Sequence, residues 1–198
     1  MTAPALRFET YRTGSGNEMM LALGPRNGPQ VLFLEAFLEE RNFLRRTMIL
    51  IARHLADAGI GSVLPDLPGT GDSLVSIAEI DLADWRRAAA DASLAIAKES
   101  GRRPVVASVR TAALIDDAAD AVGWWRFAPA IGADLLRTMR HAERLGGTPH
   151  AGYRITANLA AELERTLPAH PAGPLREAEV AALGTPLWRR AEPAEDRG

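Results

Sequence analysis

Hydrophobic and polar residues alternate at the start of the chain and then give way to longer apolar runs. Residues 5–12 alternate like a half-buried strand, and residues 18–25 fit the strand that returns after a turn at 14–17. The apolar runs 31–37 and 60–67 are typical of strands that are buried on both faces. We therefore expect an antiparallel hairpin at the edge of a mainly parallel sheet.

Segments with apolar residues at helical spacing separate these strands. The first is 39–58, closed by Gly59, and the second is 81–100, with Asp81 as its cap and Gly101 at its end. The positions expected to face the sheet are Phe43, Leu44, Ile49, Leu50 and Leu55 in the first helix and Trp85, Ala88, Ala92 and Ile96 in the second. Strands and helices that alternate at short spacing predict a sheet covered by helices on both faces.

The pattern continues past residue 100 and then weakens. The elements expected there are a strand at 104–107, a helix from the following turn to Ala121, a strand at 123–130, a helix at 133–145, a short strand at 153–155 and a helix at 159–167 capped by Thr156 or Asn158. A proline-rich connector at 168–174 and a helical or strand-like stretch at 176–190 follow. The length suits one domain over 1–198, with frayed ends at 1–4 and 194–198.

The stretch 104–116, PVVASVRTAALID, predicts a strand, a tight turn and a helix. Such an elbow needs small residues two places before and two places after its tip, because the two backbones pass close together there. With Ser108 at the tip, one flanking residue would be Val106, which is too large. With Arg110 at the tip, the flanking residues are Ser108 and Ala112, and both are small. The turn therefore carries a permanent cation, which cannot act as a nucleophile.

Arg110 and the adjacent Thr111 would lie at the carboxyl ends of the strands, where open α/β sheets bind ligands. One hypothesis is that they bind a small anionic or acyl ligand, helped by the N-terminus of the helix after the elbow. The other is that Arg110 only pairs with Glu39 or Glu40, because a half-buried guanidinium usually needs a carboxylate partner.

A charged cluster opens the helix at 39–58. Glu39, Asn42 and Arg45 recur at a spacing of three and can converge with Glu40 and Arg46 on a ligand site. The alternative is a capping arrangement, in which carboxylates occupy the first helical turn and cations follow.

Acyl chemistry would need groups that this sequence offers only weakly. The catalytic candidates are Glu39, Glu40, Asp66 and Ser108. We expect Asp72 and Ser73, beside Asp66, to satisfy backbone donors in a turn. A Ser-His-Asp triad also needs a late histidine, and we expect His141, His150 and His170 to be surface residues.

Composition excludes several classes of function. The chain has 198 residues, a formal net charge of −2 and no cysteine, which argues against nucleic acid as a partner and excludes disulfides. We expect no metal, no cofactor, no membrane span and a cytoplasmic location. Trp124, Trp125 and Trp188 are expected to anchor the core, or alternatively a homodimer surface.

Four stretches together resemble a known family. They are FLEERNFLRR at 37–46, LPDLPGTGDS at 64–73, SVRTAA at 108–113 and GTPLWRRAEP at 184–193. The chain resembles the exosortase A system-associated hydrolase (type 2) group of the α/β-hydrolase superfamily. The resemblance implies an α/β-hydrolase sheet and a setting in exopolysaccharide production. Compared with that plan, the chain is shortened between Arg144 and Gly152 and again after Pro174.

These observations lead to an α/β fold class, a reduced α/β-hydrolase fold, and to three hypotheses for function. The first is a pseudo-hydrolase that binds a ligand or partner in exosortase or exopolysaccharide systems. The second is an ester or thioester hydrolase with unusual groups, such as Glu39 or Glu40 activating water. The third is a structural subunit that pairs with another chain, as in a homo-oligomer, through an open sheet edge.

Overall fold

Six strands form one mixed sheet in the computed structural model, which describes residues 6–169. The strands are β1 (Arg7–Thr13), β2 (Gly16–Leu23), β3 (Gln30–Leu34), β4 (Gly61–Pro65), β5 (Val105–Val109) and β6 (Gly123–Phe127). Their order in the sheet is β1-β2-β4-β3-β5-β6. β1 and β2 pair antiparallel, β2 joins β4 antiparallel, and the pairs from β4 to β6 are parallel. The expected hairpin and parallel sheet are confirmed.

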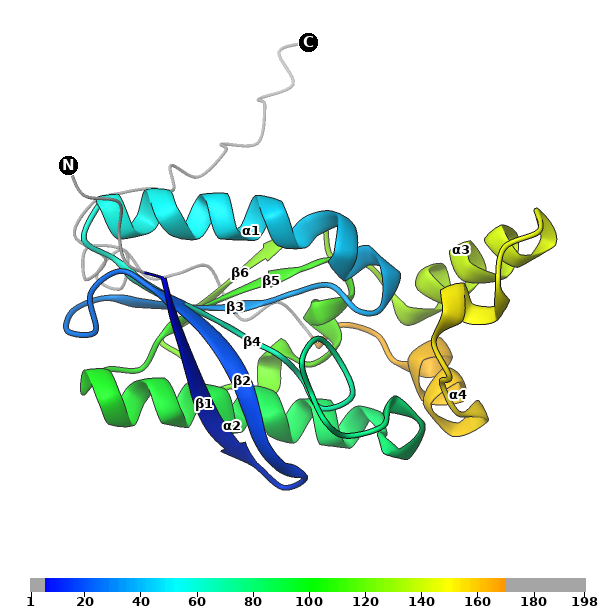
Figure 1. The fold of residues 1–198 in the computed structure, drawn as a ribbon, viewed down its shortest axis with the longest axis horizontal. Coiled ribbons are helices and arrows are strands. Elements are labelled where there is room, and N and C mark those ends of the chain that lie inside the picture. Colours follow the sequence, from blue (N-terminus) through cyan, green and yellow to red (C-terminus); the bar gives the residue numbers. More distant parts are fainter. Residues whose placement is uncertain (1–5, 170–198) are drawn as a thin grey trace, which may run out of the picture.

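Helices cover both faces of this sheet. The helices are α1 (Glu39–Asp57), α2 (Leu82–Ser100), α3 (Gly132–Arg144) and α4 (Ala157–Arg165), with short 3-10 turns η1 (Ile77–Glu79), η2 (Arg110–Leu114), η3 (Asp116–Ala118) and η4 (Pro149–Gly152). Figure 1 shows α1 on one face and α2 on the other, while α3 and α4 lie together beyond the carboxyl ends of the parallel strands. This arrangement leaves the end of the sheet that carries the elbow turn bordered by α1, α3 and α4.

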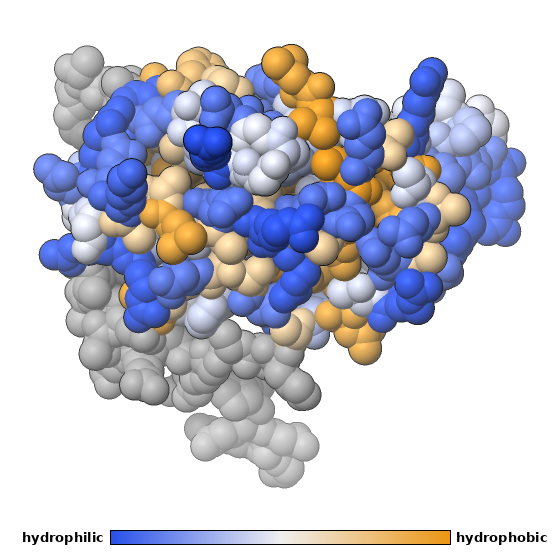
Figure 2. Space-filling view, turned by 90° about the horizontal axis from the view of Figure 1, so that it is seen from below, coloured by the Kyte–Doolittle hydropathy of each residue, from blue (hydrophilic) through white to orange (hydrophobic). Residues whose placement is uncertain are grey.

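The α2 helix confirms the predicted helix at 81–100. Its expected inner residues are all buried: Trp85, Ala88, Ala92 and Ile96. Asp81 accepts a hydrogen bond from the Asp84 N–H in a capping box, and Gly101 closes the helix in a left-handed conformation. Figure 2 views this side of the molecule, and its surface is mostly hydrophilic with scattered hydrophobic side chains.

The predicted inner face of α1 is partly wrong. Phe43 is 74% exposed and Leu50 is 44% exposed, whereas Met48, Ala52 and Leu55 form the buried contact with the sheet. The apolar positions of this helix cover a wide arc, so their spacing alone does not determine which residues face inward.

The helix predicted from the elbow to Ala121 is replaced by the two short turns η2 and η3. The break falls at Ile115, whose φ of −128° is not helical, and the next residue, Asp116, binds side chains of β5 and β6 through its buried carboxylate. A five-residue 3-10 turn offers no sizeable helix dipole, so that part of the argument for an anion site fails.

Two other expectations also differ from the structure. Residues 153–155 form no strand and follow η4 as irregular chain that leads into α4. β6 ends at Phe127 rather than at residue 130, since Ala128 has a φ of 46° and Pro129 follows it. The cap of α4 is Thr156, whose hydroxyl accepts from the Leu159 N–H.

Several sequence features lie outside the described residues. They are His170, Trp188, the motif at 184–193, the stretch at 176–190 and both predicted frayed ends. Within residues 6–169, no helix has the length and apolar character needed to cross a membrane.

Candidate functional site

The elbow turn places Arg110 at its tip. β5 ends at Val109, and Arg110 follows with a φ of 52°, a left-handed conformation that is rare for a residue with a side chain. The flanking residues Ser108 and Ala112 are both fully buried. This is the register that the steric argument predicts, with a guanidinium where a hydrolase of this plan would carry its nucleophile.

Arg110 binds a carboxylate from the first turn of α1. Its Nε donates to Glu40 Oε1 at 2.8 Å, and the other oxygen of Glu40 lies 3.5 Å from the Thr111 hydroxyl. That hydroxyl accepts from the Phe37 N–H at 2.9 Å. The turn between β3 and α1 is thus tied to the elbow, and of the two predicted partners of Arg110, the structure selects Glu40.

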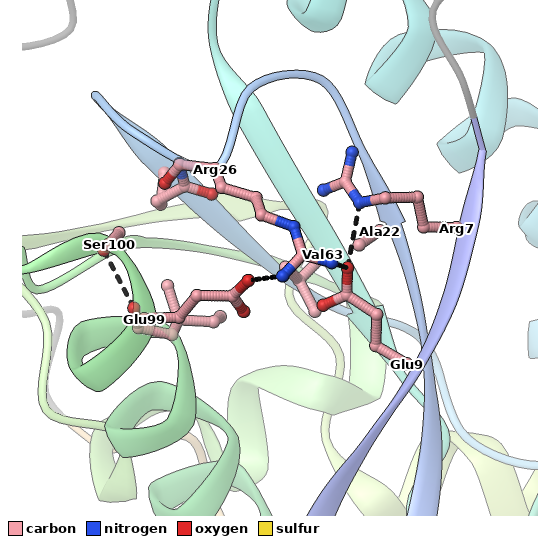
Figure 3. A pocket seen from close by; sticks show the side chains of 9 residues that line it. Arg7, Glu9, Ala22, Arg26, Val63, Glu99 and Ser100 are labelled. Carbon is pink, nitrogen blue, oxygen red and sulfur yellow. Dashed lines mark hydrogen bonds and ion pairs between the residues drawn. The ribbon is translucent and has the colours of Figure 1, made fainter.

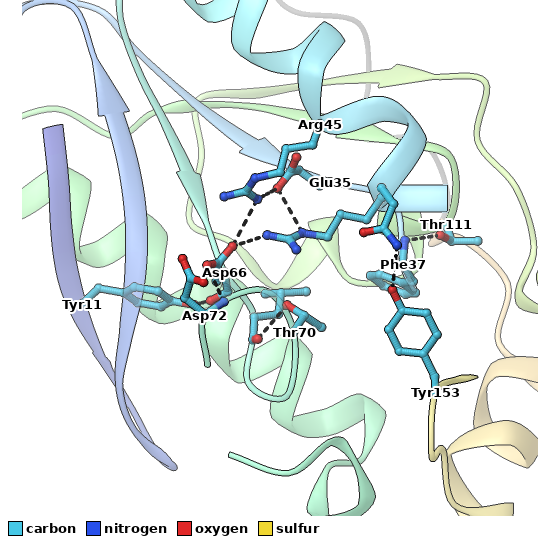
Figure 4. Close-up of polar contacts among 12 residues, drawn as sticks. Tyr11, Glu35, Phe37, Arg45, Asp66, Thr70, Asp72, Thr111 and Tyr153 are labelled. Atoms are coloured by element: carbon cyan, nitrogen blue, oxygen red, sulfur yellow. Dashed lines mark hydrogen bonds and ion pairs between the residues drawn. The ribbon is translucent and has the colours of Figure 1, made fainter. Parts of the chain in front are cut away.

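Two arginines and two carboxylates form a second cluster at the same end of the sheet (Figure 4). Arg41 Nε lies 3.2 Å from Glu35 Oε2, and Arg45 Nη1 lies 3.1 Å from Asp66 Oδ1. Arg41 also contacts Asp66, and Arg45 also contacts Glu35. Each guanidinium therefore contacts both carboxylates, and the two positive charges are balanced by the two carboxylates within the cluster.

Burial shapes the protonation of this cluster. Burial raises the pKa of the Glu35 carboxyl above its ordinary value, while the charges of Arg45 and Arg41 oppose the shift. One oxygen of Glu35 has no hydrogen-bond partner among the described residues. Sequence reasoning missed Glu35 and Arg41. A signal did exist, since Glu35 is a lone charge inside the apolar run 31–37.

The other predicted members of the α1 cluster do not converge on one point. Asn42 Nδ2 donates to the Tyr153 hydroxyl at 3.1 Å, which links α1 to the segment before α4. Glu39 is partly exposed and Arg46 is exposed. The carboxylates do occupy the first turn of α1, but no side chain caps that helix by a hydrogen bond.

Asp66 organises the turn after β4. Its Oδ2 accepts from the Asp72 N–H at 3.1 Å, and its main-chain oxygen accepts from the Tyr11 hydroxyl at 2.8 Å. Ser73 Oγ accepts from the Gly69 N–H at 3.0 Å and lies 3.0 Å from Glu18 Oε1, to which it donates. Asp66 therefore stabilises the turn from its position directly after β4.

Glu18 is a buried carboxylate beside this turn. One of its oxygens binds Ser73, and the other has no partner among the described residues. Burial raises the pKa of Glu18, the Ser73 hydrogen bond opposes the shift, and the nearby Asp66 charge adds to it.

Ser108 lies inside the molecule and away from any surface. It is fully buried, and its hydroxyl donates to Asp116 Oδ2 at 2.6 Å. Arg126 binds the same carboxylate through Nε at 2.7 Å, and Trp124 Nε1 donates to the main-chain oxygen of Asp116 at 2.9 Å. A hydroxyl placed in this way has no access to a substrate.

The described histidines do not complete a triad. His141 is exposed on α3 and His150 lies in η4, where its main-chain N–H donates to Glu143. Within residues 6–169, neither Ser108 nor Arg110 has a histidine as a hydrogen-bond partner. The same part of the chain contains no group of three side chains that could hold a metal ion.

A small hollow lies at the opposite end of the sheet from Arg110, between the start of β3 and the end of α2 (Figure 3). Its charged walls bind one another: Arg7 Nε lies 2.9 Å from Glu9 Oε1, Arg26 Nη2 lies 2.8 Å from the same oxygen, and Arg26 also contacts Glu99. Because these charged side chains already pair with one another, the hollow offers no unpaired charge from them to a ligand. The candidate site is therefore at the Arg110 end of the sheet.

No protein family matches the sequence, and no curated protein matches it. Solved structures do match. An esterase from Pyrococcus furiosus superposes with a TM-score of 0.58 at 12% identity, over 81% of this chain and 62% of that one. A candidate hydrolase from Agrobacterium vitis S4 superposes with a TM-score of 0.50 at 17% sequence identity, and the match covers 82% of this chain and 72% of that one. DcsB, in complex with its substrate analogue, superposes with a TM-score of 0.51 at 17% sequence identity, and the match covers 73% of this chain and 55% of that one.

These matches show that the chain has a reduced α/β-hydrolase fold. The chain spans less than two thirds of the esterase and of DcsB. At such low identity, the likeness concerns the fold alone.

Proposed function

We propose that this protein is a pseudo-hydrolase that binds a small anionic ligand at Arg110. The observation that carries the proposal is the strained tip of the elbow, where Arg110 has a φ of 52° at the position that carries the nucleophile in active α/β-hydrolases. Non-glycine residues in this region cost about 1 to 2 kcal/mol each, and such strain clusters at functional sites. At this tip the Arg110 side chain is 39% exposed and binds Glu40 through Nε alone within the described residues.

The hydrolase alternative, in which Glu40 activates water, is less well supported. Its carboxylate faces Arg110 Nε and the Thr111 hydroxyl, so both oxygens already have neighbours. Ser108 is fully buried and bound to Asp116. Neither group is free to act as a base or as a nucleophile on a bound ester.

A fluorophosphonate probe and a panel of p-nitrophenyl esters test the loss of acyl chemistry. We expect no labelled serine and no ester turnover above the buffer rate, with an active serine esterase as the positive control. Labelling of any serine, or turnover that disappears in Ser108→Ala, would contradict the pseudo-hydrolase proposal.

Anion binding is tested separately by thermal unfolding. We expect small carboxylates to raise the melting temperature of the wild-type protein and to have no such effect on Arg110→Ala. Circular dichroism of the variant shows whether the fold is retained. Equal stabilisation of both proteins would place the anion elsewhere.

We also propose that the ligand or partner belongs to exosortase or exopolysaccharide biology in the cytoplasm. The support is the resemblance of the motifs at 37–46, 64–73, 108–113 and 184–193 to that hydrolase group. A deletion strain with unchanged exopolysaccharide and unchanged protein sorting would argue against this setting. Homodimerisation remains a separate prediction, which light scattering of the purified protein decides.

A further inference from the structure

The guanidinium of Arg110 keeps two nitrogen atoms available. Its Nε binds Glu40, but neither terminal nitrogen makes a hydrogen bond within the described part of the chain, and the side chain is 39% exposed. By contrast, Arg41 and Arg45 each contact both Glu35 and Asp66. Unlike Arg41 and Arg45, Arg110 can therefore still receive an anion, through the planar pair of donors that suits a carboxylate.

Glu40 shows which group already fits beside Arg110. Its carboxylate lies between the Arg110 Nε and the Thr111 hydroxyl, and Thr111 is fixed in turn by the Phe37 N–H. The elbow and the turn before α1 thus hold a carboxylate that the chain itself supplies. An incoming carboxylate would bind the two terminal nitrogens of the same guanidinium, and the negative charge of Glu40 beside it would weaken that binding.

Two exposed apolar side chains lie on the elements that carry this polar centre or pair with them. Phe43 lies three residues after Glu40, on the same side of α1, and is 74% exposed. Phe127 pairs in register with Val109, next to Arg110, and is 52% exposed. It stacks on Trp125 with ring centroids 5.8 Å apart, and Trp125 packs on the α1 side of the sheet.

We infer that the Arg110 site takes a carboxylate with an apolar chain, whose head group binds the two terminal nitrogens of Arg110 next to Glu40 and whose chain lies against Phe43 and Phe127. This inference rests on the proposed anion-binding function and specifies the class of its ligand. The carboxylate accounts for the free donors of Arg110, and the chain accounts for two exposed aromatic residues beside a charged centre. The negative charge of Glu40 then lowers the affinity for this ligand.

Calorimetric titration of the full chain with sodium octanoate and with sodium acetate tests this inference. We expect octanoate to bind at least about tenfold more tightly than acetate, since its six further methylenes gain from burial. Glu40→Gln keeps an acceptor for Arg110 Nε but removes the charge, so both affinities should rise about fivefold. Glu39→Gln is the matched control, because it removes the same charge in the same helical turn, and it should change neither affinity.

Further variants separate the two parts of the site. The double variant Phe43→Ser/Phe127→Ser should weaken octanoate about tenfold and leave acetate unchanged. Arg110→Gln should abolish binding of both. If no carboxylate binds in an Arg110-dependent manner, the proposed function itself fails. If binding depends on Arg110 but ignores Glu40→Gln, or if octanoate binds no better than acetate, this inference alone is overturned.

Discussion

Ser108 Oγ donates to Asp116 Oδ2 at 2.6 Å, deep under the elbow. The same carboxylate binds Arg126, whose side chain is only 11% exposed. Ser108 is thus part of the buried network that joins β5, η3 and β6. The Ser108 hydroxyl, two residues before the tip of the elbow, therefore stabilises the fold and does not serve as a nucleophile.

Variants of this network should affect stability. Asp116→Asn should lower the free energy of unfolding by about 3 to 5 kcal/mol, because it leaves Arg126 with an uncompensated buried charge. Ser108→Ala should cost only about 1 to 2 kcal/mol, since the two contacts of Arg126 with the carboxylate remain. Urea unfolding measures both values, and an Asp116→Asn protein as stable as the wild type would contradict the network.

Substitutions of Arg110 test the backbone of the elbow. Arg110→Gly and Arg110→Ala both lose the ion pair with Glu40, but only alanine keeps the left-handed strain. We therefore expect Arg110→Gly to be more stable than Arg110→Ala by about 1 kcal/mol in urea unfolding. The reverse order would show that the tip of the turn is not left-handed.

Gly71 should tolerate no side chain. Its φ is 57°, and a Cβ there would lie 2.4 Å from the carboxyl carbon of Asp66. Gly101 has a φ of 73° but open space around it, so a substitution there measures the cost of the backbone conformation without any steric clash. We expect Gly101→Ala to cost about 1 kcal/mol and Gly71→Ala clearly more, because Asp66 must move. Equal losses in thermal or urea unfolding would count against the packing of this turn.

Glu18 should make stability depend on pH. Burial raises its pKa in the folded protein above the ordinary value of 4.5. Between these two pKa values the folded state binds more protons than the unfolded state, so stability falls as pH rises from 4.5 upward. We expect urea unfolding between about pH 5 and about pH 7 to show a smaller loss in Glu18→Gln than in the wild type. Glu79→Gln, at an exposed carboxylate, is the control. If the free energy of unfolding of Glu18→Gln changed with pH as steeply as that of the wild type, Glu18 would not be the source of the pH dependence.

The sequence by itself determined the elements whose signals are local. The hairpin, the α2 helix with its Asp81 cap and Gly101 end, and the elbow with Arg110 at its tip are all present where expected. Caps, turns and tight backbone approaches depend on residues only a few positions apart. Local physical chemistry is sufficient to predict them.

Only the tertiary structure decided which distant groups meet. Arg110 could pair with Glu39 or Glu40 by spacing alone, and α1 could bury Phe43 or Met48. In the folded protein, α1 packs on the sheet with Met48 buried and Glu40 beside Arg110. The same packing brings Arg41 and Arg45 to Asp66, which follows a different strand. Such choices depend on the orientation of whole elements around the core, which periodicity along the chain does not specify.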